Sequence, residues 1–217
     1  MKTSLEIKGA GRLRHAFFRI SPWWLDRVEQ VVLVLLWGVL LGRVLSSHNG
    51  YAPLLLLSES SVLVFVLIRR PTLAISRNAS DWMLAITATA APLLIRPEGP
   101  PWLNMAPLGV GLVLAGTIWQ ASAKLTLRRR FGVAPANRGV KGAGPYAVMR
   151  HPMYAGYLLA HIGNLVLFPS AINVVVYLIA WWAQVLRLRA EEALLSRDDV
   201  YRVYCEKVRW RLVPGLF

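Results

Sequence analysis

Long apolar stretches occupy most of the chain, and each is close to the length that a helix needs to cross a lipid bilayer. Crossing takes about 20 mostly apolar residues, whose backbone polar groups must all be hydrogen-bonded within the segment. The first stretches are Val28–Ser46, Ala52–Ile68, Asp81–Ile95 and Pro107–Ala123. The next, from Tyr154 to Leu186, is too long for one helix and is interrupted by Phe168-Pro169-Ser170. We therefore predict an all-α, polytopic membrane protein with about six transmembrane helices, the last two forming a C-terminal helical hairpin.

The composition is typical of a membrane protein rather than of a soluble one. Hydrophobic residues make up 56% of the 217 positions and charged residues only 17%, a balance too apolar for one soluble core of this size. The net charge of +14 would suit a nucleic acid, but the cations lie in short stretches between apolar runs, where they act as topology signals. We therefore expect contacts with membrane lipids and no nucleic-acid partner.

The basic residues also predict how the chain is oriented. With six crossings, one side of the membrane receives the N-terminal arm, residues 69–77, residues 124–150 and the tail after Leu186. All but two of the 25 lysines and arginines lie in these regions, the exceptions being Arg43 and Arg96. Because loops rich in lysine and arginine stay in the cytoplasm, we expect an integral, multi-pass membrane protein with cytoplasmic N- and C-termini.

Few side chains in the apolar stretches are ionisable. Glu59 and His161 are the exceptions. A carboxyl group inside a membrane helix is costly, so Glu59 either has a function or is hydrogen-bonded to neighbouring serines, and His161 is expected to be a packing residue. A conduction path would carry more such groups, which disfavours a transporter. The single cysteine, Cys205, excludes an internal disulfide, and four scattered histidines offer no metal-ligand spacing, so no metal is expected.

The chain divides into three predicted parts. Residues 1–27 form a basic cytoplasmic arm, residues 28–123 four transmembrane helices, and residues 124–217 a catalytic region of connecting loop, helical hairpin and cytoplasmic tail helix. The connection Lys124–Arg150 contains four glycines and two prolines, which favours irregular backbone of a functional kind. Both arms of the hairpin end at the cytoplasmic boundary. We therefore expect the Arg150-His151-Pro152 segment to meet Arg187, Glu191 and Glu192 there.

The motifs of this catalytic region resemble those of the isoprenylcysteine carboxyl methyltransferase family and its phospholipid N-methyltransferase relatives. The resemblance extends from about Phe131 to Pro214 and rests on Gly144-Pro145-Tyr146-x-x-x-Arg150-His151-Pro152-x-Tyr154-x-Gly156, Arg187-x-x-x-Glu191-Glu192-x-x-Leu195 and Tyr201-x-x-Tyr204-x-x-x-Val208. It implies an integral membrane methyltransferase that uses S-adenosyl-L-methionine. It also implies a cytoplasmic cofactor pocket formed by the connection, the hairpin and the tail helix.

The resemblance assigns roles to individual residues. Catalytic roles fall to Arg187, which would bind the substrate, and to Glu191. The residues that would bind the cofactor are Tyr146, His151, Pro152, Met153, Tyr154 and Glu191, with further contacts near Arg138–Lys141. Without the resemblance, His151 would be a helix-start residue before proline. Tyr201 and Tyr204 are expected to be interfacial anchors.

The chemistry of methyl transfer is compatible with these residue types. An in-line displacement from a sulfonium depends on positioning and desolvation. An arginine fork orients a carboxylate acceptor, and a glutamate accepts hydrogen bonds from cofactor hydroxyl or ammonium groups. An amine acceptor would instead need a base, for which Glu191 and Glu192 are candidates. The acceptor is expected to be lipid-like or prenylated. A phospholipid N-methyltransferase, a membrane sterol or lipid reductase using NADPH and a non-enzymatic transporter or scaffold remain alternatives.

Overall fold

The structure is a computed structural model that describes residues 22–68, 79–102, 104–127 and 142–215. Within these ranges the chain is all-α, as predicted. The helices, including two short 3₁₀ turns labelled η, are α1 (Pro22–Leu45), α2 (Pro53–Ile68), α3 (Ala79–Ala90), η1 (Ala91–Leu94), α4 (Ala106–Leu127), η3 (Gly144–Ala147), α5 (Pro152–Leu167), α6 (Ala171–Leu195) and α7 (Asp199–Lys207).

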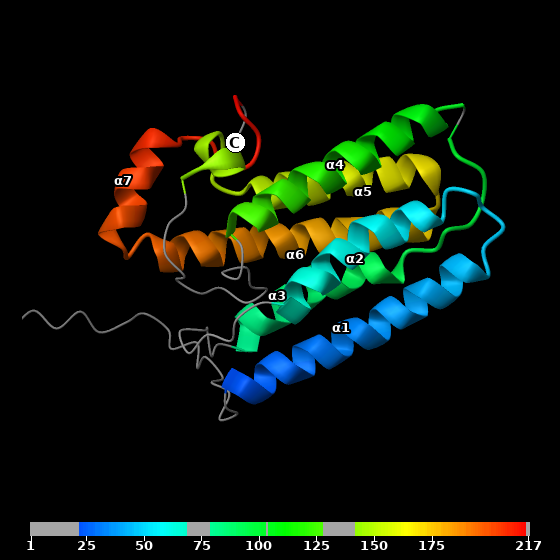
Figure 1. The fold of residues 1–217 in the computed structure, drawn as a ribbon, viewed down its shortest axis with the longest axis horizontal. Helices are drawn as coiled ribbons and strands as arrows, with labels where there is room; N and C mark the ends of the chain where they lie inside the picture. Colours follow the sequence, from blue (N-terminus) through cyan, green and yellow to red (C-terminus); the bar gives the residue numbers. More distant parts are fainter. Residues whose placement is uncertain (1–21, 69–78, 103, 128–141, 216–217) are drawn as a thin grey trace, which may run out of the picture.

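The long helices lie side by side in one elongated bundle (Figure 1). Consecutive helices from α1 to α6 alternate in direction, so the start of α1 and the end of α6 lie at the same end, where α7 is also found (Figure 1). Helix α4 packs against α5, α3 packs against α6, and α2 packs against α1 and α4. This alternation brings the start of α5 and the end of α6 together.

Three helices in the described part of the chain are long and apolar enough to cross a membrane. They are Arg27–Leu45 within α1, α4 and α6. The chain is thus a multi-pass membrane protein by helix length and composition. Helices α2 and α5 have 16 residues each and α3 has 12, which is shorter than a full crossing usually needs. Six crossings and their sidedness therefore stay predictions.

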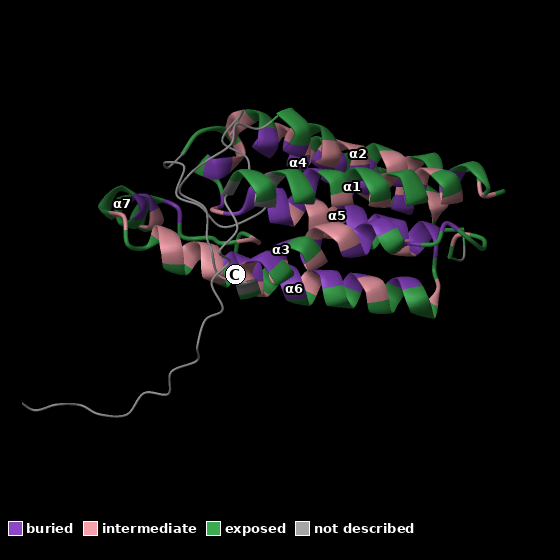
Figure 2. Ribbon diagram, turned by 90° about the horizontal axis from the view of Figure 1, so that it is seen from below, coloured by how far each residue is buried: buried purple, intermediate pink, exposed green. Residues whose placement is uncertain are grey.

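The outward faces of the bundle are apolar and exposed. Leu35, Ile118 and Trp182 are 65%, 69% and 64% exposed, and Figure 2 shows the buried residues gathered between the helices. Soluble monomers rarely expose apolar surface on this scale, whereas a lipid-facing helix requires it. The burial pattern therefore agrees with a membrane environment around the bundle.

The break between α5 and α6 lies where the sequence predicts it. Proline at position 152 starts α5, where its fixed φ suits a first helical turn. Ser170 caps α6 by accepting a hydrogen bond from the backbone N–H of Asn173 at 3.2 Å. Helix α6 then continues to Leu195, beyond the predicted end of the apolar run. Arg187 and Glu191 therefore extend from the same rigid helix that packs inside the bundle.

Lys124 lies within α4 and not in the predicted basic loop. It was expected to begin the basic connection, but α4 continues to Leu127 and the Lys124 side chain is 0% exposed. Its ammonium group donates to Ser61 Oγ at 2.9 Å and to Gln120 Oε1 at 2.8 Å. When helix ends are predicted from the ends of apolar stretches, the helix stops at the first cation. Here the helix continues because polar partners on α2 and α4 bind the buried charge. Lys124 is therefore not a loop cation.

Helices α4 and α5 approach unusually closely because glycines face each other across their interface. A Cβ atom at Gly116 would lie 2.5 Å from the Ala160 nitrogen, and one at Gly156 would lie 2.7 Å from the Gln120 nitrogen. Small residues permit this kind of backbone approach between membrane helices. The glycine of the Tyr154-x-Gly156 motif is therefore needed for packing.

Candidate functional site

The segment that precedes α5 is joined to the C-terminal tail through the backbone. The Arg150 N–H donates to the Trp210 carbonyl at 2.9 Å, and the His151 N–H donates to the Arg211 carbonyl at 2.8 Å. These bonds place the tail beside the start of α5 at the end of the bundle where α6 finishes. The Arg-His-Pro segment and the end of α6 therefore do meet, as the predicted hairpin requires.

Glu192 connects the end of α6 to the start of α5 and to the C-terminal tail. Its Oε1 atom accepts from Arg150 Nη1 at 2.9 Å and from His151 Nε2 at 3.2 Å, and its Oε2 atom accepts from Arg211 Nε at 2.7 Å. Both carboxylate oxygens are thus engaged by donors from the α5 start and from the tail. This arrangement makes Glu192 a positioning residue and a poor candidate for the base that an amine acceptor would need.

We expect Glu192→Gln to destabilise the protein without removing a cofactor contact. The Glu192 side chain is only 14% exposed, and hydrogen bonds to charged groups contribute about 1.5–3 kcal/mol. The midpoint of thermal unfolding in detergent should therefore fall by roughly 3–12 °C. Glu191→Gln is the matched control, because the adjacent carboxylate accepts only from Tyr154 within the described residues, and its midpoint should stay near that of the wild type. Equal midpoints for Glu192→Gln and the wild type would contradict the role of Glu192.

Tyr154 connects the two residues predicted to be catalytic. Its hydroxyl donates to Glu191 Oε2 at 3.1 Å, and the Arg187 guanidinium lies over its ring, 5.4 Å from the centroid. Arg187 and Glu191 are one helical turn apart on α6, so both face the same tyrosine on α5. Tyr154 and Arg187 are buried, whereas Glu191 is half-buried. A guanidinium therefore lies over the face of one aromatic ring, and a carboxylate accepts from the hydroxyl of the same ring.

Tyr146 is held in place by α7. The Tyr204 hydroxyl donates to the Tyr146 carbonyl at 2.7 Å, and burial raises the pKa of Tyr204 to about 12, so this donor stays protonated at neutral pH. Gly144 starts the turn with φ +58°, a conformation that favours glycine. Tyr201 and Tyr204 are both buried and pack against Val208. The expectation that these two tyrosines are interfacial anchors is therefore wrong, because their rings form the contact that docks α7.

The remaining predicted cofactor residues lie in the first turn of α5. His151 is the N-cap residue, and Pro152 and Met153 follow it as buried residues of the helix. The helix-start role of His151 is thus present together with its bond to Glu192. Residues Arg138–Lys141 lie outside the described residues. The cytoplasmic cofactor pocket and the cofactor-binding roles stay predictions.

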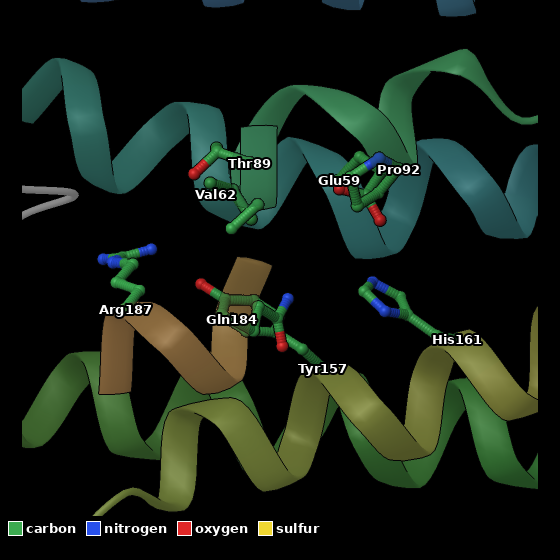
Figure 3. Close-up of a pocket in the computed structure, with 9 residues that line it drawn as sticks. Glu59, Val62, Thr89, Pro92, Tyr157, His161, Gln184 and Arg187 are labelled. Carbon is green, nitrogen blue, oxygen red and sulfur yellow. The ribbon is translucent and has the colours of Figure 1, made fainter. Parts of the chain in front are cut away.

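One cavity near Arg187 was not predicted. It is small, with a volume of about 20 Å³ that has room for about one water molecule, and α2, α3, η1, α5 and α6 all contribute to its wall (Figure 3). Glu59, His161 and Gln184 supply polar groups to this wall together with Arg187. The only sequence signal was that Glu59 and His161 are ionisable residues within apolar stretches. That both belong to one cavity required the assembly of α2, α3, α5 and α6 into one bundle.

The comparison with protein families agrees with this geometry. Residues 109–197 match the model of the isoprenylcysteine carboxyl methyltransferase (ICMT) family. The matched segment runs from α4 to just beyond α6 and contains Tyr146, Tyr154, Arg187 and Glu191. The resemblance read from the sequence is therefore confirmed. None of the curated proteins matches the chain.

Members of the ICMT family are S-adenosylmethionine-dependent methyltransferases. The residues near Tyr154 have the chemistry that such a cofactor requires. The half-buried Glu191 carboxylate can accept hydrogen bonds from hydroxyl or ammonium donors, and the aromatic rings of Tyr154 and His151, whose centroids are 5.6 Å apart, belong to the same end of α5. The residues present therefore fit the cofactor of the ICMT family.

Proposed function

We propose that the protein transfers a methyl group from S-adenosyl-L-methionine to the carboxylate of a lipid-like acceptor at the cytoplasmic boundary of the membrane. The observation that supports this most is that Arg187 and Glu191 both contact Tyr154, within the segment that matches the ICMT family. The two termini are proposed to be cytoplasmic, because the predicted topology puts the basic regions and α7 on the same side of the membrane. The acceptor then reaches the site from the lipid and the cofactor reaches it from water.

Arg187 and Glu191 have separate tasks in this proposal. When bound, the cofactor supplies an electrophilic methyl carbon attached to sulfur. Arg187 would orient the acceptor by pairing with its carboxylate, so that one carboxylate oxygen faces the methyl carbon that the cofactor would supply. No proton is transferred, so no base is needed. Glu191 holds the cofactor through its hydroxyl or ammonium donors, and Tyr154 fixes the position of both side chains.

A carboxylate acceptor is favoured over the amine of a phospholipid. Glu192 is engaged by Arg150, His151 and Arg211, and Glu191 is bonded to Tyr154 and lies near Arg187. A buried guanidinium next to the reacting group attracts an anion and disfavours a protonated amine. The cation at position 187 therefore suits carboxyl O-methylation.

We expect S-adenosylhomocysteine to bind the purified protein and Glu191→Gln to weaken that binding about 10- to 100-fold. The reason is that one charge-assisted hydrogen bond, worth about 1.5–3 kcal/mol, becomes a neutral one. Calorimetric titration measures the affinity. Glu206→Gln on the exposed side of α7 is the control and should bind as the wild type does. Binding of NADPH in place of S-adenosylhomocysteine would overturn the methyltransferase proposal in favour of a reductase.

A further inference from the structure

Polar side chains from three helices line the small cavity near Arg187. Gln184 and Arg187 are about one turn apart on α6, His161 belongs to α5, and Glu59 belongs to α2. Figure 3 shows Gln184 between Arg187 and His161, with Glu59 opposite His161. A volume of about 20 Å³ admits one water molecule, which typically needs about two to four polar partners. The wall of this cavity supplies that number.

Gln184 is the lining side chain that most requires a ligand. It is only 8% exposed, and its amide has no hydrogen-bond partner within the described residues. An amide buried in a bundle of membrane helices is costly unless each of its polar atoms is hydrogen-bonded. A molecule in the cavity would therefore satisfy a group that the neighbouring side chains leave unsatisfied.

His161 offers a hydrogen-bond donor to the same cavity. The Trp181 indole N–H donates to His161 Nδ1 at 3.1 Å, and an indole nitrogen cannot accept a hydrogen bond. The Nδ1 atom is therefore unprotonated, and the ring carries its proton on Nε2. Stacking on Tyr177, with centroids 4.4 Å apart, fixes the ring. His161 thus has one N–H group left to donate.

Glu59 supplies an acceptor and a negative charge. Its Oε1 atom accepts from Ser58 Oγ at 3.1 Å, and the buried Lys124 interacts with it electrostatically. A carboxylate in the wall disfavours an anion in the cavity, and the guanidinium of Arg187 in the same wall disfavours a cation. The wall therefore favours a neutral molecule that both donates and accepts hydrogen bonds, which is the chemistry of water.

We propose that this cavity binds one buried water molecule, which donates to Glu59 and accepts from His161 Nε2–H and from the Gln184 amide. By accepting from the amide N–H group, the water turns the Gln184 carbonyl oxygen toward Arg187 on the same face of α6. The carbonyl then orients the guanidinium that pairs with the acceptor carboxylate. Gln184 is thus a positioning residue. This second step rests on the proposed function, whereas the water site does not.

An experimental structure of the full-length protein, at a resolution that shows ordered solvent, tests the water site. We expect one solvent peak within hydrogen-bond distance of Glu59, His161 and Gln184 in the wild type. We expect no peak there in Gln184→Met, which removes the amide with little change in shape. A wild-type cavity without a solvent peak would overturn the proposal. So would an anomalous bromide peak at this position in crystals grown with bromide, because it would reveal an anion site.

Methyl-transfer kinetics test the positioning role of Gln184. N-acetyl-S-farnesylcysteine, which carries a free carboxylate on an isoprenylated cysteine, serves as the acceptor. Gln184→Met should raise KM for this acceptor roughly 2- to 12-fold and leave kcat near the wild-type value, because a hydrogen bond that acts on acceptor binding is lost. Gln30→Met is the matched control. Gln30 is equally buried but donates to the Val66 carbonyl at 3.1 Å outside this cavity, so its KM should not change.

A second variant keeps the kinetic test decisive if Gln184→Met does not fold. His161→Phe removes a donor to the same water, keeps an aromatic ring next to Tyr177, and should raise KM in the same way. A purely structural role would lower kcat through loss of active protein while KM stayed constant, and would overturn the positioning role. A wild-type protein without methyl transfer would contradict the proposed function and the positioning role, while the solvent peak would still decide the water site.

Discussion

Replacing Arg187 by alanine is expected to reduce methyl transfer to a carboxylate acceptor strongly while cofactor binding persists. Loss of one partner of a buried charge pair costs about 2–5 kcal/mol, which corresponds to a decrease in kcat/KM of roughly 30- to 5,000-fold. The guanidinium is buried over the Tyr154 ring. The decrease should be measured with labelled methyl donor and a carboxylate acceptor. Calorimetry with S-adenosylhomocysteine on the same variant should give an affinity close to that of the wild type.

The same helix offers a matched control for this prediction. Arg189 lies two positions further along α6 and its side chain is exposed, so Arg189→Ala should retain activity. Arg187→Lys keeps the positive charge but loses the planar fork, and we expect an activity between those of the wild type and Arg187→Ala. Equal losses in Arg187→Ala and Arg189→Ala would show that bulk positive charge, rather than a fork near Tyr154, is what the reaction needs.

Gly156→Ala is expected to cause a large loss of stability. The new Cβ would lie 2.7 Å from the Gln120 nitrogen and 2.8 Å from the Gly116 carbonyl oxygen, and these are backbone atoms that cannot rotate away. Helices α4 and α5 must then separate. Overpacking costs about 1–3 kcal/mol where side chains can adjust, so the cost here should reach or exceed the upper value. The yield of monodisperse protein in detergent and the midpoint of thermal unfolding measure it.

Gly111 is the control for this substitution because it lies on α4 and a Cβ there would meet nothing within 4 Å. Gly111→Ala should leave the midpoint unchanged or raise it, since alanine is favoured over glycine in a helix by about 1 kcal/mol. Separation of α4 from α5 also displaces Tyr154 and His161, so Gly156→Ala should lose acceptor and cofactor binding together. Equal midpoints for both variants would mean that the helices adjust without strain.

Local pattern predicted most of the fold. Apolar length and the Phe168-Pro169-Ser170 break placed α5 and the start of α6 to within a few residues, because these helix ends depend on proline, capping and hydrophobic periodicity in consecutive residues. The end of α6 lies nine residues beyond the predicted one, at Leu195 rather than Leu186. The motif spacing predicted that His151 meets the end of α6. The two predicted arms of the hairpin have similar lengths, so the second arm returns the chain to the side of the membrane where the first arm began. The six crossings and cytoplasmic termini stay predictions from the same patterns.

Tertiary structure alone decided which polar groups are partners. Glu191 and Glu192 are neighbours with the same side chain, yet one bonds to Tyr154 and the other to Arg150, His151 and Arg211, because a rotation of about 100° along α6 points them at different elements. From the sequence Lys124 was expected to be a loop cation, but its ammonium group donates hydrogen bonds to Ser61 and Gln120 inside the bundle. Glu59 and His161 are separate exceptions in the sequence and share one cavity in the fold. Sequence determines which face of a helix a residue occupies, and only packing determines what that face meets.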